Sequence, residues 1–235
     1  MAVSAEILEA LRGISTATLT IQMLKSHGLR TRAVADVRPI SPTNCRFVGI
    51  ASTLRYVPAR EDLWHEAVLD SPANPTSDLI ETMPPGNVLV IDMGGSSAGG
   101  ALGDILVARL IARGVAGVVA DGPMRDAGPL GTMSLAIWSK GCTAPPSFCG
   151  LLAVDRDVTV GCGGVLVRPG DVIVADEDGP IVIPQHLAEE LARAGLEQER
   201  MEAWIKARVE AGASTRGLYP PGDAALAEYR AAVDS

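Results

Sequence analysis

Residues 88–130 constrain the fold of this chain most, because they predict a strand, a helix and a second strand in direct succession. The run 88–91 is apolar and β-branched and is followed by Asp-Met-Gly-Gly, a pattern typical of a buried strand that ends in a turn. Apolar residues then recur at spacings of three and four over 102–111, which predicts a helix ending at the Arg-Gly pair 113–114. A second apolar run, 115–120, completes a predicted βαβ unit.

The polar residues of this unit are expected to gather at one edge of the sheet. Parallel strands joined by a right-handed crossover end on the same side, where open α/β sheets bind their ligands. A glycine-rich loop over residues 94–103 leads into the helix, whose first N–H groups favour an anion. Asp104 stands in the first helical turn, and Arg125 and Asp126 follow the second strand. A guanidinium can bind a carboxylate through two hydrogen bonds, and an aspartate can bind a hard divalent cation.

Each of these residues also has a purely structural interpretation. Arg125 and Asp126 could form a salt bridge that holds a loop in place. Asp104 could balance the positive end of the helix dipole without taking part in any chemistry. The three together, at this spacing, favour a functional site.

The spacing of the three residues resembles that of a known family. Asp104, twenty intervening residues and then Arg125-Asp126, preceded by the glycine-rich loop and by the run 117–122, are similar to the RraA-like superfamily. That superfamily includes the class II 4-hydroxy-4-methyl-2-oxoglutarate/4-carboxy-4-hydroxy-2-oxoadipate aldolases and the RraA regulators of ribonuclease E. The similarity covers nearly the whole chain. It has one departure: many members carry an acidic residue four positions after the arginine, where this chain has Pro129.

The resemblance implies a fold and an assembly. We expect an α/β fold, a layered ββα sandwich with a central βαβ unit, N-terminal helices and a C-terminal helix. Residues 1–235 are expected to form a single domain, in which residues 185–235 are a helical extension that contacts a neighbouring subunit. The implied assembly is a homo-oligomer, either a trimer or a hexamer.

The resemblance also implies roles for individual residues. Asp126 would bind Mg²⁺ or Mn²⁺, Asp104 would orient a metal-bound water, and Arg125 would face the keto oxygen of a 2-keto acid. The backbone amides of three residues at the helix start would hold the substrate carboxylate: Gly103, Ile105 and Leu106. A glutamate from a neighbouring subunit would reach the metal-bound water, and the best match for it is Glu199, with Glu202 second.

The expected reaction is the cleavage of a 4-hydroxy-2-keto acid to pyruvate and a second carbonyl compound. An enolate must be stabilised as the carbon–carbon bond breaks, either by a divalent metal or by a lysine Schiff base. The chain has three lysines, Lys25, Lys140 and Lys206, and none lies in residues 88–130, which favours the metal route. The same chemistry would decarboxylate oxaloacetate. The alternative is a non-catalytic, protein-binding regulator of the RraA type.

Composition excludes other classes of function. A net charge of −8, from 20 basic and 28 acidic residues, argues against a protein that binds nucleic acid through its phosphates. The sequence shows neither a membrane-spanning run nor a signal peptide, so we expect a cytoplasmic protein that does not bind a membrane. The four cysteines form no CxxC pair and are expected to be buried free thiols.

Patterns outside the central unit predict the remaining elements. Two N-terminal helices are expected over residues 5–12 and from about 15 to 27, and a short helix over 76–83. Strands are expected at 47–51 and 53–57, at 158–160 and 165–167, and in a hairpin over 172–183 whose acidic tip is a polar turn. Residues 135–147 are expected to hold turns and short extended pieces, and a charged helix is expected from 184 to about 212. His65 is expected to be an ordinary exposed histidine.

Overall fold

The computed structural model describes residues 3–60, 62 and 74–233 of the chain. Within these residues the helices are α1 (Ala5–Arg12), α2 (Thr16–His27), α3 (Pro75–Thr82), α4 (Asp104–Ala112), α5 (Ala127–Leu130), α6 (Ala188–Glu210) and α7 (Asp223–Val233), with short 3-10 helices at Ser147–Cys149 and Gln185–Leu187. The strands are β1 (Arg38–Pro39), β2 (Phe47–Pro58), β3 (Asn87–Asp92), β4 (Gly117–Ala120), β5 (Ala136–Ser139), β6 (Leu151–Arg156), β7 (Val160–Cys162), β8 (Val165–Val167), β9 (Val172–Asp176) and β10 (Gly179–Ile183). His65 lies outside the described residues.

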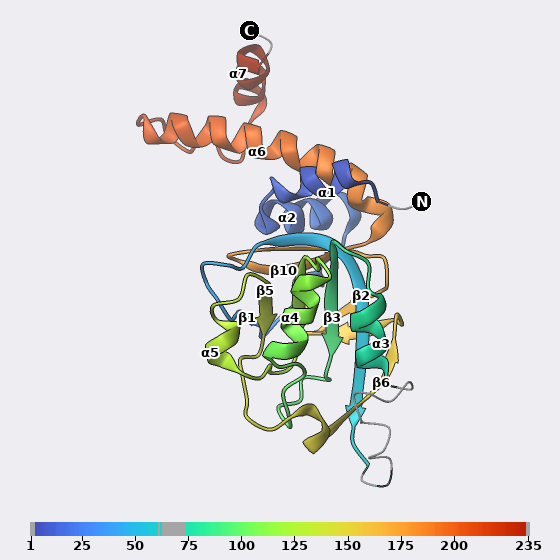
Figure 1. Ribbon diagram of the computed structural model, residues 1–235. Helices are drawn as coiled ribbons and strands as arrows, with labels where there is room; N and C mark the ends of the chain where they lie inside the picture. Colours follow the sequence, from blue (N-terminus) through green and yellow to red (C-terminus); the bar gives the residue numbers. More distant parts are fainter. Residues whose placement is uncertain (1–2, 61, 63–73, 234–235) are drawn as a thin grey trace.

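One curled sheet organises the molecule, with strand order β1-β5-β4-β3-β2-β9-β10 and β6 paired to β2 (Figure 1). Strands β2, β3, β4 and β5 are mutually parallel neighbours. The long strand β2 connects the two halves: Phe47 to Ile50 pair with β9, and the residues from Ile50 to Arg55 pair with β3. The two strands predicted at 47–51 and 53–57 are therefore one continuous strand of 12 residues.

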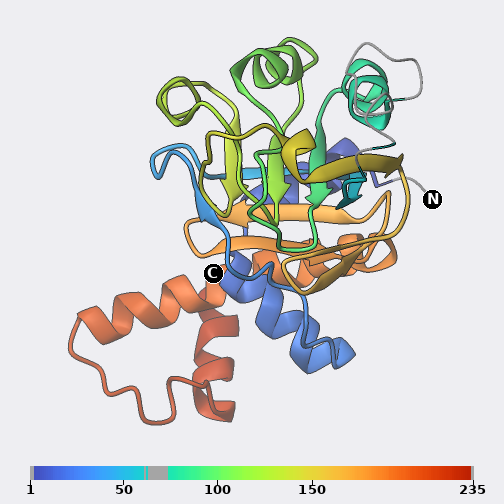
Figure 2. The same cartoon turned by 90° about the horizontal axis from the view of Figure 1, so that it is seen from below.

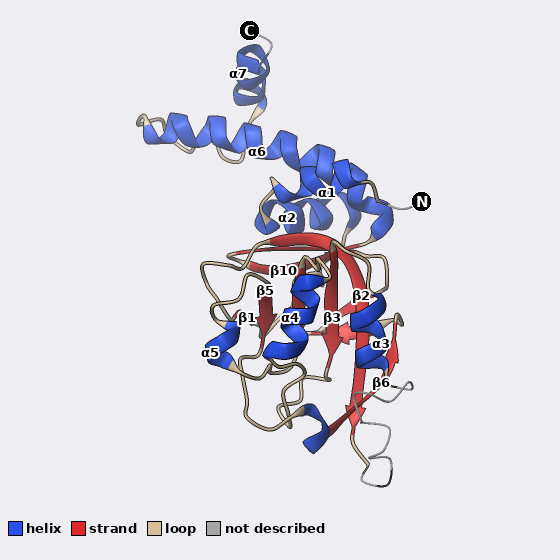
Figure 3. Ribbon diagram, in the orientation of Figure 1, coloured by secondary structure: helices blue, strands red, loops and turns tan. Residues whose placement is uncertain are grey.

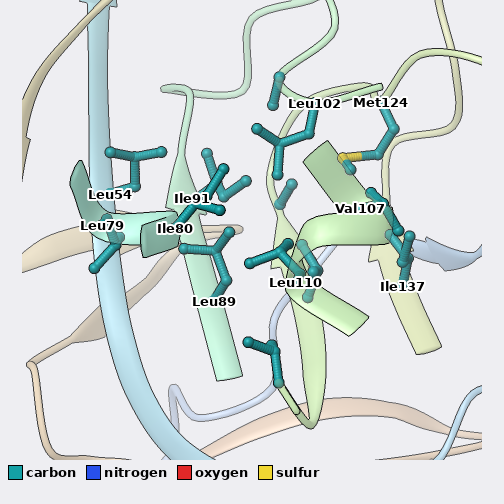
Figure 4. Packing of buried hydrophobic residues seen from close by; sticks show 14 of the residues in the cluster. Leu54, Leu79, Ile80, Leu89, Ile91, Leu102, Val107, Leu110, Met124 and Ile137 are labelled. Atoms are coloured by element: carbon teal, nitrogen blue, oxygen red, sulfur yellow. The ribbon is translucent and has the colours of Figure 1, made fainter. Parts of the chain in front are cut away.

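The molecule is layered, with helices on both outer faces and two layers of strands between them (Figure 2). Alternate residues of β3 serve different layers because side chains of a strand point to opposite faces. Leu89 and Ile91 pack with helices α3 and α4, while Val88 and Val90 pack toward β9 and β10. Figure 4 shows the first of these clusters, where the labelled side chains of β3, α3 and α4 meet. The predicted α/β fold and its ββα layering are confirmed.

The N-terminal helices and the start of α6 cover the outer face of β9 and β10. Ile181 and Ile183 of β10 contribute to this cluster, and Val182 faces the opposite way. The β9–β10 hairpin is confirmed, but its acidic tip is more than a polar turn. Asp176 is buried, and its carboxylate accepts hydrogen bonds of 2.7 Å from both the N–H and the hydroxyl of Thr16, at the start of α2.

The C-terminal region consists of two helices rather than the single one expected from 184 to 212. Helix α6 is 23 residues long and extends away from the sheet, and α7 packs back on its distal half (Figure 3). A small separate cluster joins them, with Ile205 from α6 and Ala225 from α7. Trp204 of α6 meets Tyr229 of α7 edge to face, with ring centroids 5.6 Å apart. The predicted C-terminal extension, residues 185–235, thus contains the helices α6 and α7, which pack on each other within one chain.

Several local predictions need correction. Cys45 and Cys162 are buried as expected, whereas Cys142 and Cys149 are exposed because they lie outside the core strands, Cys149 at the end of the 3-10 helix Ser147–Cys149. The region expected to hold turns and short extended pieces contains strand β5, whose four residues are all buried, and strand β6, which was not predicted, follows it. The helices of the described residues include none with both the length and the hydrophobicity needed to span a bilayer.

Candidate active site

The predicted βαβ unit is present and sets the position of the site. β3 and β4 run parallel, with Val88 opposite Gly117 and Ile91 opposite Ala120, and α4 connects them. Figure 1 shows that β3 points toward the edge of the sheet at which α4 begins. The loops that follow β3 and β4 therefore meet at the start of α4, as the sequence predicted.

Arg125 is held at this edge by backbone hydrogen bonds and by close packing. Its N–H donates to the carbonyl of Leu102 at 2.9 Å, which ties the loop after β4 to the loop before α4. Gly100 leaves the space that the arginine stem occupies, because a Cβ at Gly100 would lie 2.5 Å from Arg125 Cγ. The position of the arginine thus depends on Gly100, which the sequence analysis treated only as one residue of the glycine-rich loop.

The guanidinium of Arg125 has no protein partner among the described residues. It forms no ion pair there, and its Nε is buried without a hydrogen bond. Leaving a buried charged donor unpaired costs free energy, on the order of 1–3 kcal/mol or more, unless a ligand supplies the acceptor. The salt bridge between Arg125 and Asp126, the structural interpretation of this pair, is not formed. The side chain is instead free to bind an anion.

Asp126 directs its carboxylate toward the start of α4. Its backbone is left-handed, with φ 59° and ψ 52°, a conformation that aspartate tolerates better than most residues. Oδ2 accepts a hydrogen bond of 3.2 Å from the N–H of Asp104. A Cβ at Gly103 would lie 2.3 Å from that oxygen, so only glycine leaves room for it. Asp104 and Asp126 are therefore neighbours, as predicted.

The start of α4 offers free backbone donors, although fewer than expected. The N–H of Ile105 is taken by Asp104 Oδ1 at 2.8 Å. The N–H groups of Gly103 and Leu106 make no hydrogen bond within the described part of the chain. Two of the three amides predicted to hold a carboxylate are thus available, and the third binds an aspartate of the chain itself.

A pocket opens beside Arg125, between α4 and the strands β2 and β6. Arg125, Gly103 and Leu106 line one side of it. Tyr56 and Thr76 also line it, and they are buried and hydrogen-bonded to each other at 3.2 Å. Burial raises the pKa of Tyr56, so its hydroxyl stays protonated near neutral pH. The described lining of the pocket therefore combines one cation, Arg125, with uncharged hydroxyl groups.

Asp121 is a site-supporting residue to which the sequence assigned no role. It is buried, and its carboxylate accepts hydrogen bonds from the N–H groups of Met93, at 2.6 Å, and Gly95, at 3.2 Å. A third comes from Gly163 at 3.4 Å. Burial raises the pKa of Asp121, and the nearby carboxylate of Asp92 raises it further. Asp121 therefore fixes the glycine turn after β3. In the sequence, only its position in the Asp-Gly pair at the end of β4 could have indicated this role.

The donor set suits a hydrated hard cation. Among the described residues, no group of three or more His, Cys, Asp or Glu side chains comes together as a metal site. Oδ2 of Asp126 lies 3.2 Å from the backbone N of Asp104, so the two aspartates can supply carboxylate oxygens at the start of α4. Mg²⁺ usually binds through one or two carboxylates, with water and substrate filling the other positions, so these residues fit Mg²⁺ or the similar Mn²⁺.

Glu199 and Glu202 are not part of the site within one chain. Both lie on α6, which Figure 1 shows beyond the other end of β3. Oε1 of Glu199 accepts hydrogen bonds from the N–H and the hydroxyl of Ser15, at 3.0 and 2.8 Å. Glu202 accepts one from Gln198 on the same helix. Glu199 thus secures the start of α2 in its own chain.

Comparison with known proteins identifies the family. Residues 4–182 match the model of the RraA-like family, described as Aldolase/RraA, and the chain therefore belongs to this family. A Deinococcus radiodurans protein named "Putative 4-hydroxy-4-methyl-2-oxoglutarate aldolase" is 37% identical over 140 residues, which are 59% of this chain and 78% of that protein. A Halalkalibacterium halodurans protein of the same name is 38% identical over 102 residues, 43% of this chain. The match spans about half of that relative, 48% of its length.

Solved structures agree with this assignment. The crystal structure of Streptomyces coelicolor RraAS2, described as an unusual member of the RNase ES inhibitor RraA protein family, has a TM-score of 0.77 and 32% identity. It covers 88% of this chain and 98% of that one. An uncharacterized protein from Pseudomonas syringae has a TM-score of 0.81 and 25% identity, covering 93% and 95%. The predicted family resemblance is confirmed.

Proposed function

We propose that this chain is a divalent-metal-dependent lyase of the aldolase type, which cleaves 4-hydroxy-2-keto acids to pyruvate and a second carbonyl compound. The carrying observation is the guanidinium of Arg125, which has no partner among the described residues and belongs to the same loop as Asp126, whose carboxylate bonds to the start of α4. The names of the sequence relatives support the same reaction, with 4-hydroxy-4-methyl-2-oxoglutarate as the type of substrate.

In this proposal the start of α4 and Arg125 bind the keto-acid end of the substrate. The free N–H groups of Gly103 and Leu106 bind its carboxylate, helped by the positive end of the helix dipole. The guanidinium of Arg125 faces the keto oxygen and stabilises the negative charge that develops there as the bond breaks. Arg125 can do this only because no acidic side chain of the described residues neutralises it.

Asp126 would hold the cation, Mg²⁺ or Mn²⁺, and Asp104 would hold it through a water. When bound, the cation supplies a Lewis acid for the charge of the enolate. Asp126 has its Oδ2 anchored by the N–H of Asp104, and Asp104 has its Oδ1 anchored by the N–H of Ile105, so both carboxylates are held in place. A water held near Asp104 and Arg125 takes the proton of the 4-hydroxyl group. Oxaloacetate, which also yields the enolate of pyruvate, would be decarboxylated at the same site.

We also propose that the working form is a homo-oligomer, a trimer or a hexamer, in which Glu199 acts on the site of a neighbouring subunit. Glu199 is held in place within its own chain by hydrogen bonds from Ser15 to Oε1, at 3.0 and 2.8 Å, and by one from Thr18. The side chain of Ile105, in the first turn of α4, is 81% exposed, which supports a subunit contact close to the site.

A second candidate is a regulator that binds an RNase without catalysis. The likeness to Streptomyces coelicolor RraAS2 supports it, since that protein is described as a member of an RNase ES inhibitor family. One set of assays separates the two candidates. The lyase predicts pyruvate release from 4-hydroxy-2-keto acids, measured with lactate dehydrogenase and NADH, that EDTA abolishes and Mg²⁺ or Mn²⁺ restores. Inhibition of an RNase, with no release of pyruvate under any metal condition, would instead support the regulator.

A further inference from the structure

A second cavity is separate from the pocket beside Arg125. Its volume of about 680 Å³ falls within the range of roughly 300–1,000 Å³ that small-molecule sites occupy. Its described lining comes from the end of α2 and the residues after it, the turn between β8 and β9, and the 3-10 helix before α6. None of these described lining residues belongs to the pocket beside Arg125, so the cavity is a distinct candidate site.

Four side chains that can carry positive charge line this cavity: Arg32, Arg168, His27 and His186. Neither arginine forms an ion pair with any described residue. The Nε of Arg32 is buried and makes no hydrogen bond within the described part of the chain. Such a donor costs free energy unless a ligand supplies an acceptor. In a chain of net charge −8, two unpaired guanidiniums around one cavity indicate a site for an anion.

The acidic groups near the cavity do not neutralise these arginines. Asp171 is the one carboxylate of the described lining, and its Oδ2 accepts a hydrogen bond of 2.9 Å from the backbone N–H of Arg168. Oε1 of Glu190 lies 3.3 Å from Nε2 of His27. Neither carboxylate is ion-paired with a guanidinium of the cavity, so both guanidiniums remain available to a ligand.

Apolar side chains line the same cavity and set a second property of its ligand. Leu29, Leu166 and Leu187 belong to this lining, and Leu166 is 52% exposed. A planar guanidinium binds a carboxylate or a phosphate through two parallel hydrogen bonds. Apolar surface gains free energy when a hydrocarbon group covers it. The lining therefore suits an organic anion better than an inorganic one.

We infer that this cavity binds a small organic anion, whose carboxylate or phosphate group is held by Arg32 and Arg168 and whose apolar part contacts Leu29, Leu166 and Leu187. The inference goes beyond the proposed lyase function and does not depend on it, because the two sites share no described lining residue. A carboxylate and a phosphate monoester offer the same hydrogen-bonding chemistry, and the experiment compares them directly.

Three probes with the same phenyl ring test the inference by isothermal titration calorimetry: benzoate, phenyl phosphate and the neutral benzyl alcohol. We expect saturable binding of at least one anion with a Kd of about 1 mM or below, and binding of benzyl alcohol that is at least about tenfold weaker. The anion that binds more tightly identifies the preferred head group. Binding of benzyl alcohol as tight as that of the anions, or no saturable binding of any probe, would overturn the inference.

Four variants locate the bound anion. Arg32→Gln and Arg168→Gln each remove one charged donor and should weaken binding at least about tenfold. Arg30→Gln is the matched control, because Arg30 is exposed and is not among the described residues that line the cavity. Arg125→Ala removes the cation of the proposed lyase site. Arg30→Gln and Arg125→Ala should both keep Kd within about threefold of wild type.

Two further results would contradict the site. Binding that Arg125→Ala abolishes and Arg32→Gln retains would place the anion at the lyase site. A change in oligomeric state of Arg32→Gln on size-exclusion chromatography, with no binding of free anion by wild type, would give the arginines an acidic side chain of another subunit as their partner. Arg168 is exposed, so Arg168→Gln decides if Arg32→Gln does not fold.

Discussion

The substitution Gly103→Ala tests whether the exact position of the Asp126 carboxylate matters. Gly103 precedes α4 with φ −103° and ψ −175°, an extended backbone that alanine adopts without strain. Its new Cβ would lie 2.3 Å from Asp126 Oδ2, whereas ordinary contacts begin at 3.4 Å. The carboxylate must therefore move by about 1.1 Å, the difference between these two distances.

The expected result is a large loss of activity with a small loss of stability. A misplacement of about 1 Å in a catalytic site can reduce the rate about a hundredfold, and we expect kcat/KM to fall by that order. Exchange of glycine for alanine at a helix N-cap costs about 1 kcal/mol, so Tm should fall by only about 2–4 °C in a chain of this size. The measurements are pyruvate release with saturating Mg²⁺ and thermal unfolding.

Gly128→Ala is the matched control. Gly128 lies in α5, two residues after Asp126, and a Cβ there would meet nothing within 4 Å. Activity of this variant should stay within about threefold of wild type. If Gly103→Ala retains the same activity as Gly128→Ala, the carboxylate of Asp126 does not need its observed position and the proposed site is wrong.

Three further substitutions give distinct results. Asp126→Asn removes the charge but keeps a residue that tolerates φ 59°. We therefore expect kcat/KM to fall about a hundredfold or more while Tm stays almost unchanged. A normal rate would exclude Asp126 as a metal ligand. Asp121→Asn turns an N–H donor toward the amides of Met93 or Gly95 and should cost about 1–3 kcal/mol in a denaturant titration, and an unchanged midpoint would contradict its role in fixing the turn. Because burial raises the pKa of Asp121 in the folded state, its contribution to stability is present below its unfolded pKa of 3.8 and is lost as the pH rises through the folded value. Burial alone would raise the pKa of Glu199, but hydrogen bonds from Ser15 and Thr18 lower it overall. The free energy of unfolding of wild type should therefore exceed that of Glu199→Gln by about 1 kcal/mol at pH 7, and this difference should disappear as the pH falls below 4.5. The proposed role of Glu199 at a neighbouring site also predicts a loss of pyruvate release in Glu199→Gln of about a hundredfold, and full activity would contradict that role.

The parts of the fold that the sequence predicted are those with strong local patterns. The βαβ unit follows from apolar runs of strand and helix length, and its strand ends necessarily bring Asp104 near Arg125 and Asp126. The hairpin over β9 and β10 follows from two β-branched runs around a turn. In each case neighbouring residues along the chain carry the whole signal.

The parts that the sequence did not predict depend on contacts between distant segments. Asp121 resembles any aspartate before a glycine, and its role appears only when β7 brings Gly163 beside the turn after β3. Tyr56 and Thr76 are twenty positions apart, and neither belongs to a motif. Both nevertheless line the pocket beside Arg125, where they are hydrogen-bonded to each other. Where strand β5 lies, the sequence predicted only short extended pieces, because its four residues are buried on both faces and show no alternation.

The most direct test of the site is the turnover of Arg125→Ala, with Arg109→Ala as control. Arg109 belongs to the same βαβ unit but is exposed and paired with Glu81, at 2.6 Å, so its loss should leave the rate within about threefold. Arg125→Ala should lower the rate of metal-dependent pyruvate release by at least about a hundredfold, because the developing enolate charge loses its guanidinium partner. A rate close to wild type in a folded Arg125→Ala protein would contradict the central claim that this unpaired arginine is the group on which the reaction depends.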